Sequence, residues 1–244
     1  MTASPVLGAK KTFGGPETSA SGFAHKVLEV DISMLAETPD TAQLIEQATR
    51  GDGQACHKLL VRHQARLRQM VVVRMDRQLA ARVDPSDVVQ DALAEAHRTM
   101  EDYLRRRPLP FYPWLRRLAW ERLIQVHRQH AEAGKRNLLR ERGMDLGLPD
   151  QSAMMLANRL IASGTSPSRH AIREETRDRV RAALDGLTPR NREVLVLRFL
   201  EQLSTAETAA VLEIGEGAVR SRLMRAVVRF RNLLDEAEVE EDWQ

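Results

Sequence analysis

The sequence has very little of what stabilises secreted or membrane-spanning proteins. Cys56 is its only cysteine, which excludes a disulfide framework within one chain and is typical of a reducing compartment. No apolar run approaches the length of a transmembrane helix, and the N-terminal segment lacks the apolar core of a signal peptide. We therefore expect a cytoplasmic protein without membrane contact, in which Cys56 is a small buried side chain rather than a reactive thiol.

The composition that remains is that of a helical, nucleic-acid-binding protein. Hydrophobic residues make up 43% and charged residues 29% of the 244 positions, enough to bury one or two domain cores. The formal net charge is only +3, yet the sequence pI is about 9.3. Nearly balanced charge with a basic excess indicates local basic patches that face a polyanion, not a uniformly cationic chain.

Helical periodicity dominates from residue 41 onward and predicts an all-α fold. Two helical domains joined by a flexible linker are expected, the second one a helix-turn-helix. The first domain should contain helices at 41–50, 54–75, 85–104 and 114–130. The expected organisation is a mobile N-terminal arm (1–39, with a short strand or docking segment at 27–35), a first domain (40–131), a linker (132–168), a second domain (169–234) and an acidic tail (235–244).

The most informative segment is Leu203 to Leu223. Ser204 followed by Glu207 predicts a capping box at the start of a short helix. A break at 213–215 should lead into a second helix with Val219 directed inward and arginines outward, so that the pair forms a helix-turn-helix whose second helix can enter the DNA major groove. An ordinary helical hairpin with solvated arginines is the plainer alternative.

The helix expected at 85–104 begins with an Asp84-Pro85 start signal and carries an acidic face. Asp87 and Asp91 are four residues apart, so they share one side of the helix. From the residues alone, this acidic face is interpreted either as a solvated surface or as a metal site formed with Glu95 and His97. The metal site is disfavoured because residues along a single helix make a row, not a cage.

The helix expected at 114–130 combines arginines with an aromatic side chain, a pattern suited to unpaired bases and phosphates. Its candidate residues are Arg116, Arg117, Trp120, Gln125 and Arg128. Trp114 is expected in the core. Phe111 and Tyr112, in the preceding loop, suit either base capture or hydrophobic anchoring, and the sequence does not decide between them.

In order and spacing, these motifs resemble bacterial sigma factors of the extracytoplasmic-function type. The resemblance covers about 41–130 and 175–234. It rests on DVVQDAL at 87–93, WLRRLA at 114–119, LTPRNREVL at 187–195 and AVRSRL at 218–223. The runs DPSD at 84–87 and PLPFYPW at 108–114 resemble members abundant in planctomycetes. Glu121, Gln125, Glu213 and Ala218 depart from the usual Asn, Asp, Gly and Thr.

The resemblance implies a transcription initiation factor that is not itself an enzyme and needs no cofactor. Its implied partners are the polymerase core (β′ clamp helices and β flap), promoter DNA and, where one exists, an anti-sigma protein. The implied core-binding residues are Asp87, Val88, Gln90 and Asp91. The implied −35-reading residues are Glu216, Gly217, Arg220, Ser221, Arg222 and Arg225, and the candidates on 114–130 would read and melt the −10 element. A conventional helix-turn-helix regulator is the alternative.

Overall fold

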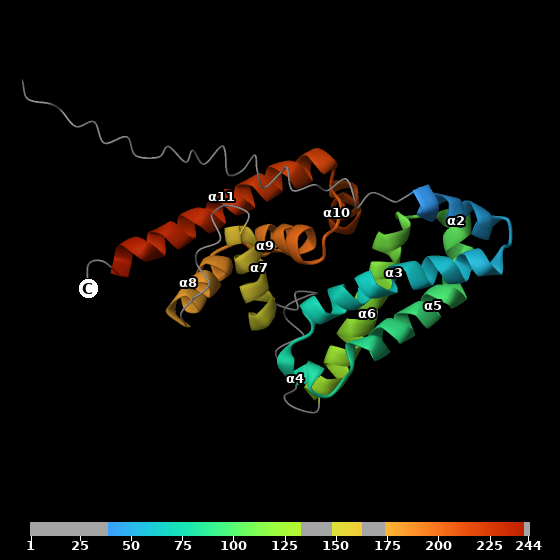
Figure 1. Cartoon of the computed structure of the whole chain (residues 1–244), viewed down its shortest axis with the longest axis horizontal. Helices are drawn as coiled ribbons and strands as arrows, with labels where there is room; N and C mark the ends of the chain where they lie inside the picture. The colour runs from blue at the N-terminus through green and yellow to red at the C-terminus, as the bar shows by residue number, and fades with distance from the viewer. Residues whose placement is uncertain (1–38, 133–147, 163–173, 242–244) are drawn as a thin grey trace, which may run out of the picture.

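The computed structural model describes residues 39–132, 148–162 and 174–241, and within these ranges it is all-helical, as predicted (Figure 1). The expected strand at 27–35 lies outside the described residues. The N-terminal half consists of α2 (Pro39–Thr49), α3 (Gly53–Arg74), α4 (Arg77–Ala80), α5 (Pro85–Arg106) and α6 (Phe111–Glu132). The C-terminal half consists of α7 (Asp150–Ala162), α8 (Glu174–Asp185), α9 (Pro189–Leu195), the π-helical turn η2 (Val196–Leu200), α10 (Thr205–Leu212) and α11 (Glu216–Glu241).

Aspartate caps begin three helices of the N-terminal half, α3, α4 and α5. Asp52 accepts hydrogen bonds from the backbone at the start of α3, and Asp76 does so for α4. Asp84 accepts from the Ser86 backbone with Pro85 in the first turn of α5, which confirms the predicted start signal. Each cap satisfies an N–H group that would otherwise have no partner within the helix.

An aromatic cluster forms the centre of the N-terminal core. The rings of Tyr103 and Trp114 stack 4.2 Å apart, with Phe111 beside both. Phe111 and Tyr112 are buried and lie in the first turn of α6, so the structure decides for hydrophobic anchors over base-capturing groups. The loop before α6 is therefore shorter than the sequence predicts, and α6 begins three residues earlier.

Part of the predicted linker is a core element of the C-terminal half. Within 132–168, the structure contains α7, whose buried residues Leu156, Ala157 and Leu160 belong to the C-terminal hydrophobic cluster; this helix packs against α8 and η2. The expectation of a flexible linker over 132–168 is therefore wrong for 150–162. The apolar stripe is only one helix long, and its partner surface is supplied by helices that follow later in the chain.

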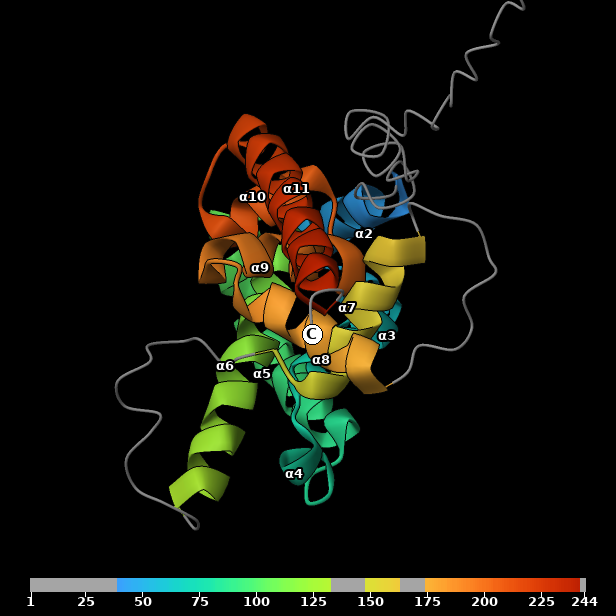
Figure 2. The same ribbon diagram turned by 90° about the vertical axis from the view of Figure 1, so that its left-hand side faces the viewer.

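The two halves pack directly against each other. Leu197 and Leu203 of the C-terminal half belong to the N-terminal hydrophobic cluster, and Val73 at the end of α3 belongs to the C-terminal cluster. Ser152 of α7 donates a hydrogen bond of 2.7 Å to the Val73 carbonyl. Helix α11 lies on the outer side of the C-terminal half (Figures 1 and 2) and continues to Glu241, so most of the expected acidic tail is helical.

Replacing Leu156 by Ala should therefore destabilise the protein by about 2–5 kcal/mol, because the leucine is fully buried and the cavity left behind cannot be filled by its neighbours. Asn158→Ala, on the exposed side of the same helix, is the matched control and should change the free energy of unfolding by less than about 0.5 kcal/mol. Urea denaturation measures both. Equal effects of the two substitutions would contradict the assignment of α7 to the core.

Candidate nucleic-acid interface

Helices α10 and α11 form the predicted helix-turn-helix. The capping box is confirmed, since the Glu207 backbone donates to the Ser204 hydroxyl at 3.0 Å and the Ser204 backbone donates to the Glu207 carboxylate at 2.8 Å. Glu213 ends α10 in the left-handed region at φ 54°, which directs the chain into the second helix. Ala209 and Val219 are buried where the two helices meet, as expected.

The residues predicted to contact the −35 element lie on the first three turns of α11. Arg220, Ser221 and Arg225 are exposed, as are Glu216 and Gly217, while Arg222 is half-buried. Arg220 forms an ion pair of 3.4 Å with Glu216 on the same helix. An exposed pair of this kind contributes little to stability, so the guanidinium can exchange it for a phosphate or a base edge.

The acidic face of α5 is only partly as predicted. Asp87, Gln90 and Asp91 are exposed, but Val88 is buried with only 1% of its surface accessible. In this arrangement Val88 therefore packs in the core beneath the acidic face and has almost no accessible surface for a partner. Asp91 accepts a hydrogen bond of 2.8 Å from Arg122 of α6, which leaves Asp87 as the more available carboxylate.

The candidate residues of α6 divide into two groups. Arg117, Gln125 and Arg128 are exposed. Trp120 is half-buried, and Arg116 is only 6% exposed. Arg116 points toward the C-terminal half, where it contacts Glu201, and its guanidinium lies 5.8 Å from the centroid of the Trp120 ring. In this arrangement Arg116 is covered and cannot contact DNA.

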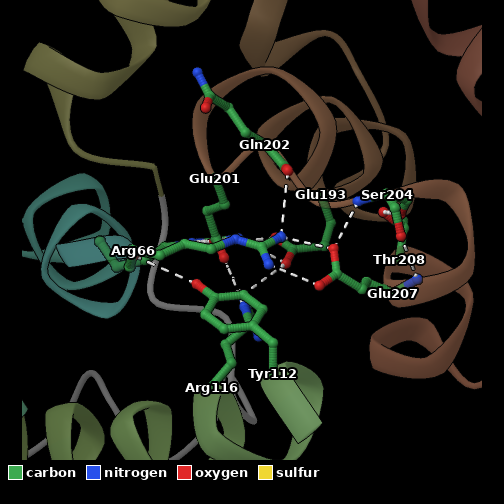
Figure 3. A network of polar contacts seen from close by, with 10 residues as sticks. Arg66, Tyr112, Arg116, Glu193, Glu201, Gln202, Ser204, Glu207 and Thr208 are labelled. Atoms are coloured by element: carbon green, nitrogen blue, oxygen red, sulfur yellow. Dashed lines mark hydrogen bonds and ion pairs between the residues drawn. The ribbon is translucent and has the colours of Figure 1, made fainter. Parts of the chain in front are cut away.

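Arg116 is covered by a set of charged residues that lies between the two halves (Figure 3). We call this set the buried ion network. Its members are three arginines from α3 and α6 (Arg66, Arg74 and Arg116) and three glutamates from the C-terminal half (Glu193, Glu201 and Glu207).

At its centre, the Glu201 carboxylate accepts hydrogen bonds from Arg74 Nε at 2.7 Å and Arg116 Nε at 2.6 Å. Arg74 also forms a two-pronged pair with Glu193, at 2.7 and 2.8 Å. Planar, two-pronged pairs of this kind are among the strongest polar contacts in proteins.

A π-helical turn places Glu201 in the network. In a continuous α-helix, two residues eight positions apart point about 80° away from each other. The wider turn of η2 adds one residue to the helical path, so Glu201 comes close to the direction of Glu193. Both carboxylates can then reach Arg74.

Glu207 belongs both to the capping box of α10 and to the network. Its two carboxylate oxygens accept from Arg66 of α3 at 2.7 and 2.6 Å, and the Arg66 guanidinium lies 3.6 Å from the centroid of the Tyr112 ring. The helix-turn-helix is therefore attached at its first turn to the N-terminal half.

The charges of the network shift the pKa values of its members. Burial by itself would raise the pKa of Glu201, but the positive charges of Arg116 and Arg74 and their hydrogen bonds outweigh it and lower the pKa to about 2. Burial would lower the pKa of Arg74, but the carboxylates of Glu193 and Glu201 outweigh it and raise the pKa instead. Glu201 and Arg74 are therefore both charged at neutral pH.

Sequence reasoning missed the network, apart from Arg116 and Glu207, which it had assigned other roles. Arg74 ends a helix with the apolar run Val71 to Val73 before it, and Glu201 follows the apolar run Val194 to Leu197 closely. A charge beside an apolar helical stripe is the signal available in the sequence, but it does not indicate which distant residue is the partner.

Within the described ranges, no group of three or more His, Cys, Asp or Glu residues is arranged to hold a metal ion. In the same part of the chain, no helix is both long and apolar enough to cross a membrane.

Known bacterial proteins are similar in sequence to this chain. Residues 177–230 match the family described as sigma-70, region 4. The RNA polymerase sigma-H factor of Pseudomonas aeruginosa is 29% identical over 204 residues, which cover 84% of this chain and 96% of the relative. The ECF RNA polymerase sigma-E factor of Escherichia coli is 29% identical over 189 residues, which cover 75% and 88%. The solved structure of CnrH in complex with the cytosolic domain of CnrY shares 26% identity, with a TM-score of 0.46, over 81% of this chain and 98% of that one.

The helix-turn-helix, the basic α6 helix and the sigma-70 region 4 match define an RNA polymerase sigma factor, a factor that recruits the polymerase to promoters and promotes −10 melting at initiation. Within that class, the Escherichia coli relative is named as a factor of the extracytoplasmic-function (ECF) type.

The buried ion network predicts a specific acid sensitivity. Because the pKa of Glu201 is lowered from 4.5 to about 2, its contribution to stability is complete above about pH 4.5 and is lost as the pH falls toward 2. Between pH 6 and pH 3.5 this loss should amount to roughly 1.5 kcal/mol.

Urea denaturation at the two pH values tests this prediction. Glu201→Gln should lower stability at both values, since two buried arginines lose a partner, but it should show a shallower pH dependence than the wild type. Glu236→Gln on the exposed surface of α11 is the control and should keep the wild-type slope. Identical slopes for Glu201→Gln and wild type would contradict the assigned pKa.

Proposed function

We propose that this sigma factor divides its three tasks among three helices. The acidic face of α5 binds the polymerase core, α6 reads and opens the −10 element, and the N-terminal turns of α11 read the −35 element. The observation that supports this division best is the helix-turn-helix, in which a capped α10 supports an exposed, arginine-bearing start of α11. That segment lies inside the region 4 match.

Core binding through α5 is supported by the exposure and charge of Asp87, Gln90 and Asp91. A carboxylate pair on one helix face suits a basic partner helix, such as the β′ clamp helices that the resemblance implies. Asp91 would have to exchange Arg122 for an arginine of the polymerase, and its ion pair is half-exposed, so the cost of the exchange is small.

The −10 role of α6 is supported by the residue types along it. Arg117, Gln125 and Arg128 form the exposed part, and Trp120 provides an aromatic ring beside Arg116. Arginine and tryptophan together can stack on unpaired bases and neutralise the adjacent phosphates. The β flap as a second contact and an anti-sigma protein stay predictions from the resemblance.

The subtype is also a proposal. The planctomycete-like two-domain type is supported by the runs at 84–87 and 108–114. In the structure these runs start two helices, since Asp84 caps α5 and the Pro110 carbonyl accepts from the Trp114 backbone at the start of α6.

Reversing both charges of the α5 face tests core binding. Asp87→Lys/Asp91→Lys should reduce retention of the sigma factor on core polymerase, because losing charge-assisted pairs at an interface costs about 2–5 kcal/mol. Glu101→Lys/Asp102→Lys, which makes the same change in net charge near the other end of α5, should bind as wild type does. Unchanged core binding by Asp87→Lys/Asp91→Lys, in a variant with normal circular dichroism, would rule out this face.

The −35 assignment is tested on α11. Arg220→Ala should weaken promoter binding by the holoenzyme and flatten its salt dependence, since each lost phosphate contact lowers the salt slope by about 0.9. Arg229→Ala removes an equally exposed arginine farther along the same helix, where it pairs with Glu236, and should change neither. Core binding should be normal in both variants. A salt titration in which Arg220→Ala matches the wild type would refute the role.

A further inference from the structure

One arginine of α6 contacts members of two proposed sites. Arg122 donates from Nε to Oδ2 of Asp91 on α5 at 2.8 Å, and its Nη2 lies 2.7 Å from the same oxygen. Its other terminal nitrogen, Nη1, donates to Oε1 of Gln125 at 3.3 Å. Asp91 belongs to the proposed polymerase-binding face and Gln125 to the proposed −10-reading residues, whereas Arg122 has so far been given no role of its own.

The bond from Arg122 determines which way the Gln125 amide faces. A guanidinium carries only donors, so it can pair with the carbonyl oxygen of a glutamine amide but not with the NH2 group. Oε1 of Gln125 is therefore directed toward Arg122, and Nε2 with its two N–H groups lies on the opposite side of the amide. Because the Gln125 side chain is exposed, these N–H groups are available to an incoming partner.

This orientation does not depend on the contact between Arg122 and Asp91. Arg122 and Gln125 are three residues apart in one helix, so their side chains are neighbours on its surface. They stay neighbours when Asp91 exchanges Arg122 for an arginine of the polymerase, and the orienting bond can therefore persist in the holoenzyme.

An amide held in this way distinguishes two classes of base. Guanine and thymine present keto oxygens, which accept hydrogen bonds, whereas adenine and cytosine present amino groups, which donate them. A glutamine that reads adenine uses both ends of its amide, and here the oxygen end is already engaged by Arg122. The NH2 end of Gln125 suits a keto base and would face a second donor on an amino base.

We propose that Arg122 is a positioning residue that sets the base preference of Gln125. By holding Oε1, it makes Gln125 a donor, so that Gln125 favours a keto base over an amino base at the position of the −10 element that it reads. This inference rests on the proposed −10 role of Gln125 and assigns that site its class of base.

The test uses the holoenzyme and a set of promoters in which each −10 position carries each of the four bases in turn. The measured quantity is the ratio of open-complex formation rates with keto and amino bases at one position. The position read by Gln125 is the one whose ratio moves to about 1 in Gln125→Ala. There the wild type should favour keto bases by about two- to tenfold, the effect of one hydrogen bond made or lost.

Three substitutions of Arg122 separate orientation from other effects. Arg122→Lys keeps a group that only donates, so the keto preference should remain. Arg122→Glu offers only acceptors, so the Gln125 amide should turn over, present its oxygen and favour amino bases. Arg122→Ala leaves the amide free to adopt both orientations, and the ratio should fall toward 1. Each ratio compares promoters on the same holoenzyme, so a change in core affinity or a lost phosphate contact cancels.

The matched control is Arg50→Glu, which makes the same charge change at an exposed arginine directly after α2, where it pairs with Glu46 at 3.7 Å. It should keep the wild-type ratio at every position. A wild-type ratio in Arg122→Glu, or equal loss of preference in Arg122→Lys and Arg122→Glu, would overturn the positioning role alone. Wild-type ratios at all positions in Gln125→Ala would remove the proposed −10 role of Gln125 itself, and this inference with it.

Discussion

The arrangement of this protein depends on a single carboxylate. Glu201, with 2% of its surface accessible, lies between two arginines of the other half of the molecule, and a buried charge is tolerated only where it is paired and fully hydrogen-bonded. That requirement fixes the relative position of α3, α6 and η2. Three features accompany this position of Glu201: the π-helical turn, the buried position of Arg116, and the contact of Arg66 with the capping glutamate of α10.

The same contact connects stability to function. A sigma factor has to bring two DNA-reading elements to sites far apart on a promoter, yet in this structure the helices proposed to read them are packed into one body. The exposed side chains of the α5 face and of the start of α11 form contacts outside the network, such as Asp91 with Arg122 and Arg220 with Glu216.

Local signals account for the parts of the fold that sequence reasoning recovered. The Asp84-Pro85 helix start and the Ser204–Glu207 capping box are each satisfied within four residues, and each is present in the structure. Helix α7 was missed because its leucines face helices that come later in the chain. Phe111 and Tyr112 left two readings open, since an aromatic side chain before a helix serves either the core or a ligand, and only burial in the tertiary structure distinguishes them.

By itself, the sequence determined the class of the protein, its helical composition and the helix-turn-helix, because caps, periodicity and motif spacing act between neighbouring residues. Only the tertiary structure decided which charges are surface groups and which are buried partners. Arg116 and Arg117 are adjacent in one helix, yet one is buried against Glu201, and the other is exposed and pairs with Glu121 on its own helix. The partner of Arg116 lies 85 positions farther along the chain, and no local pattern specifies a contact over that separation.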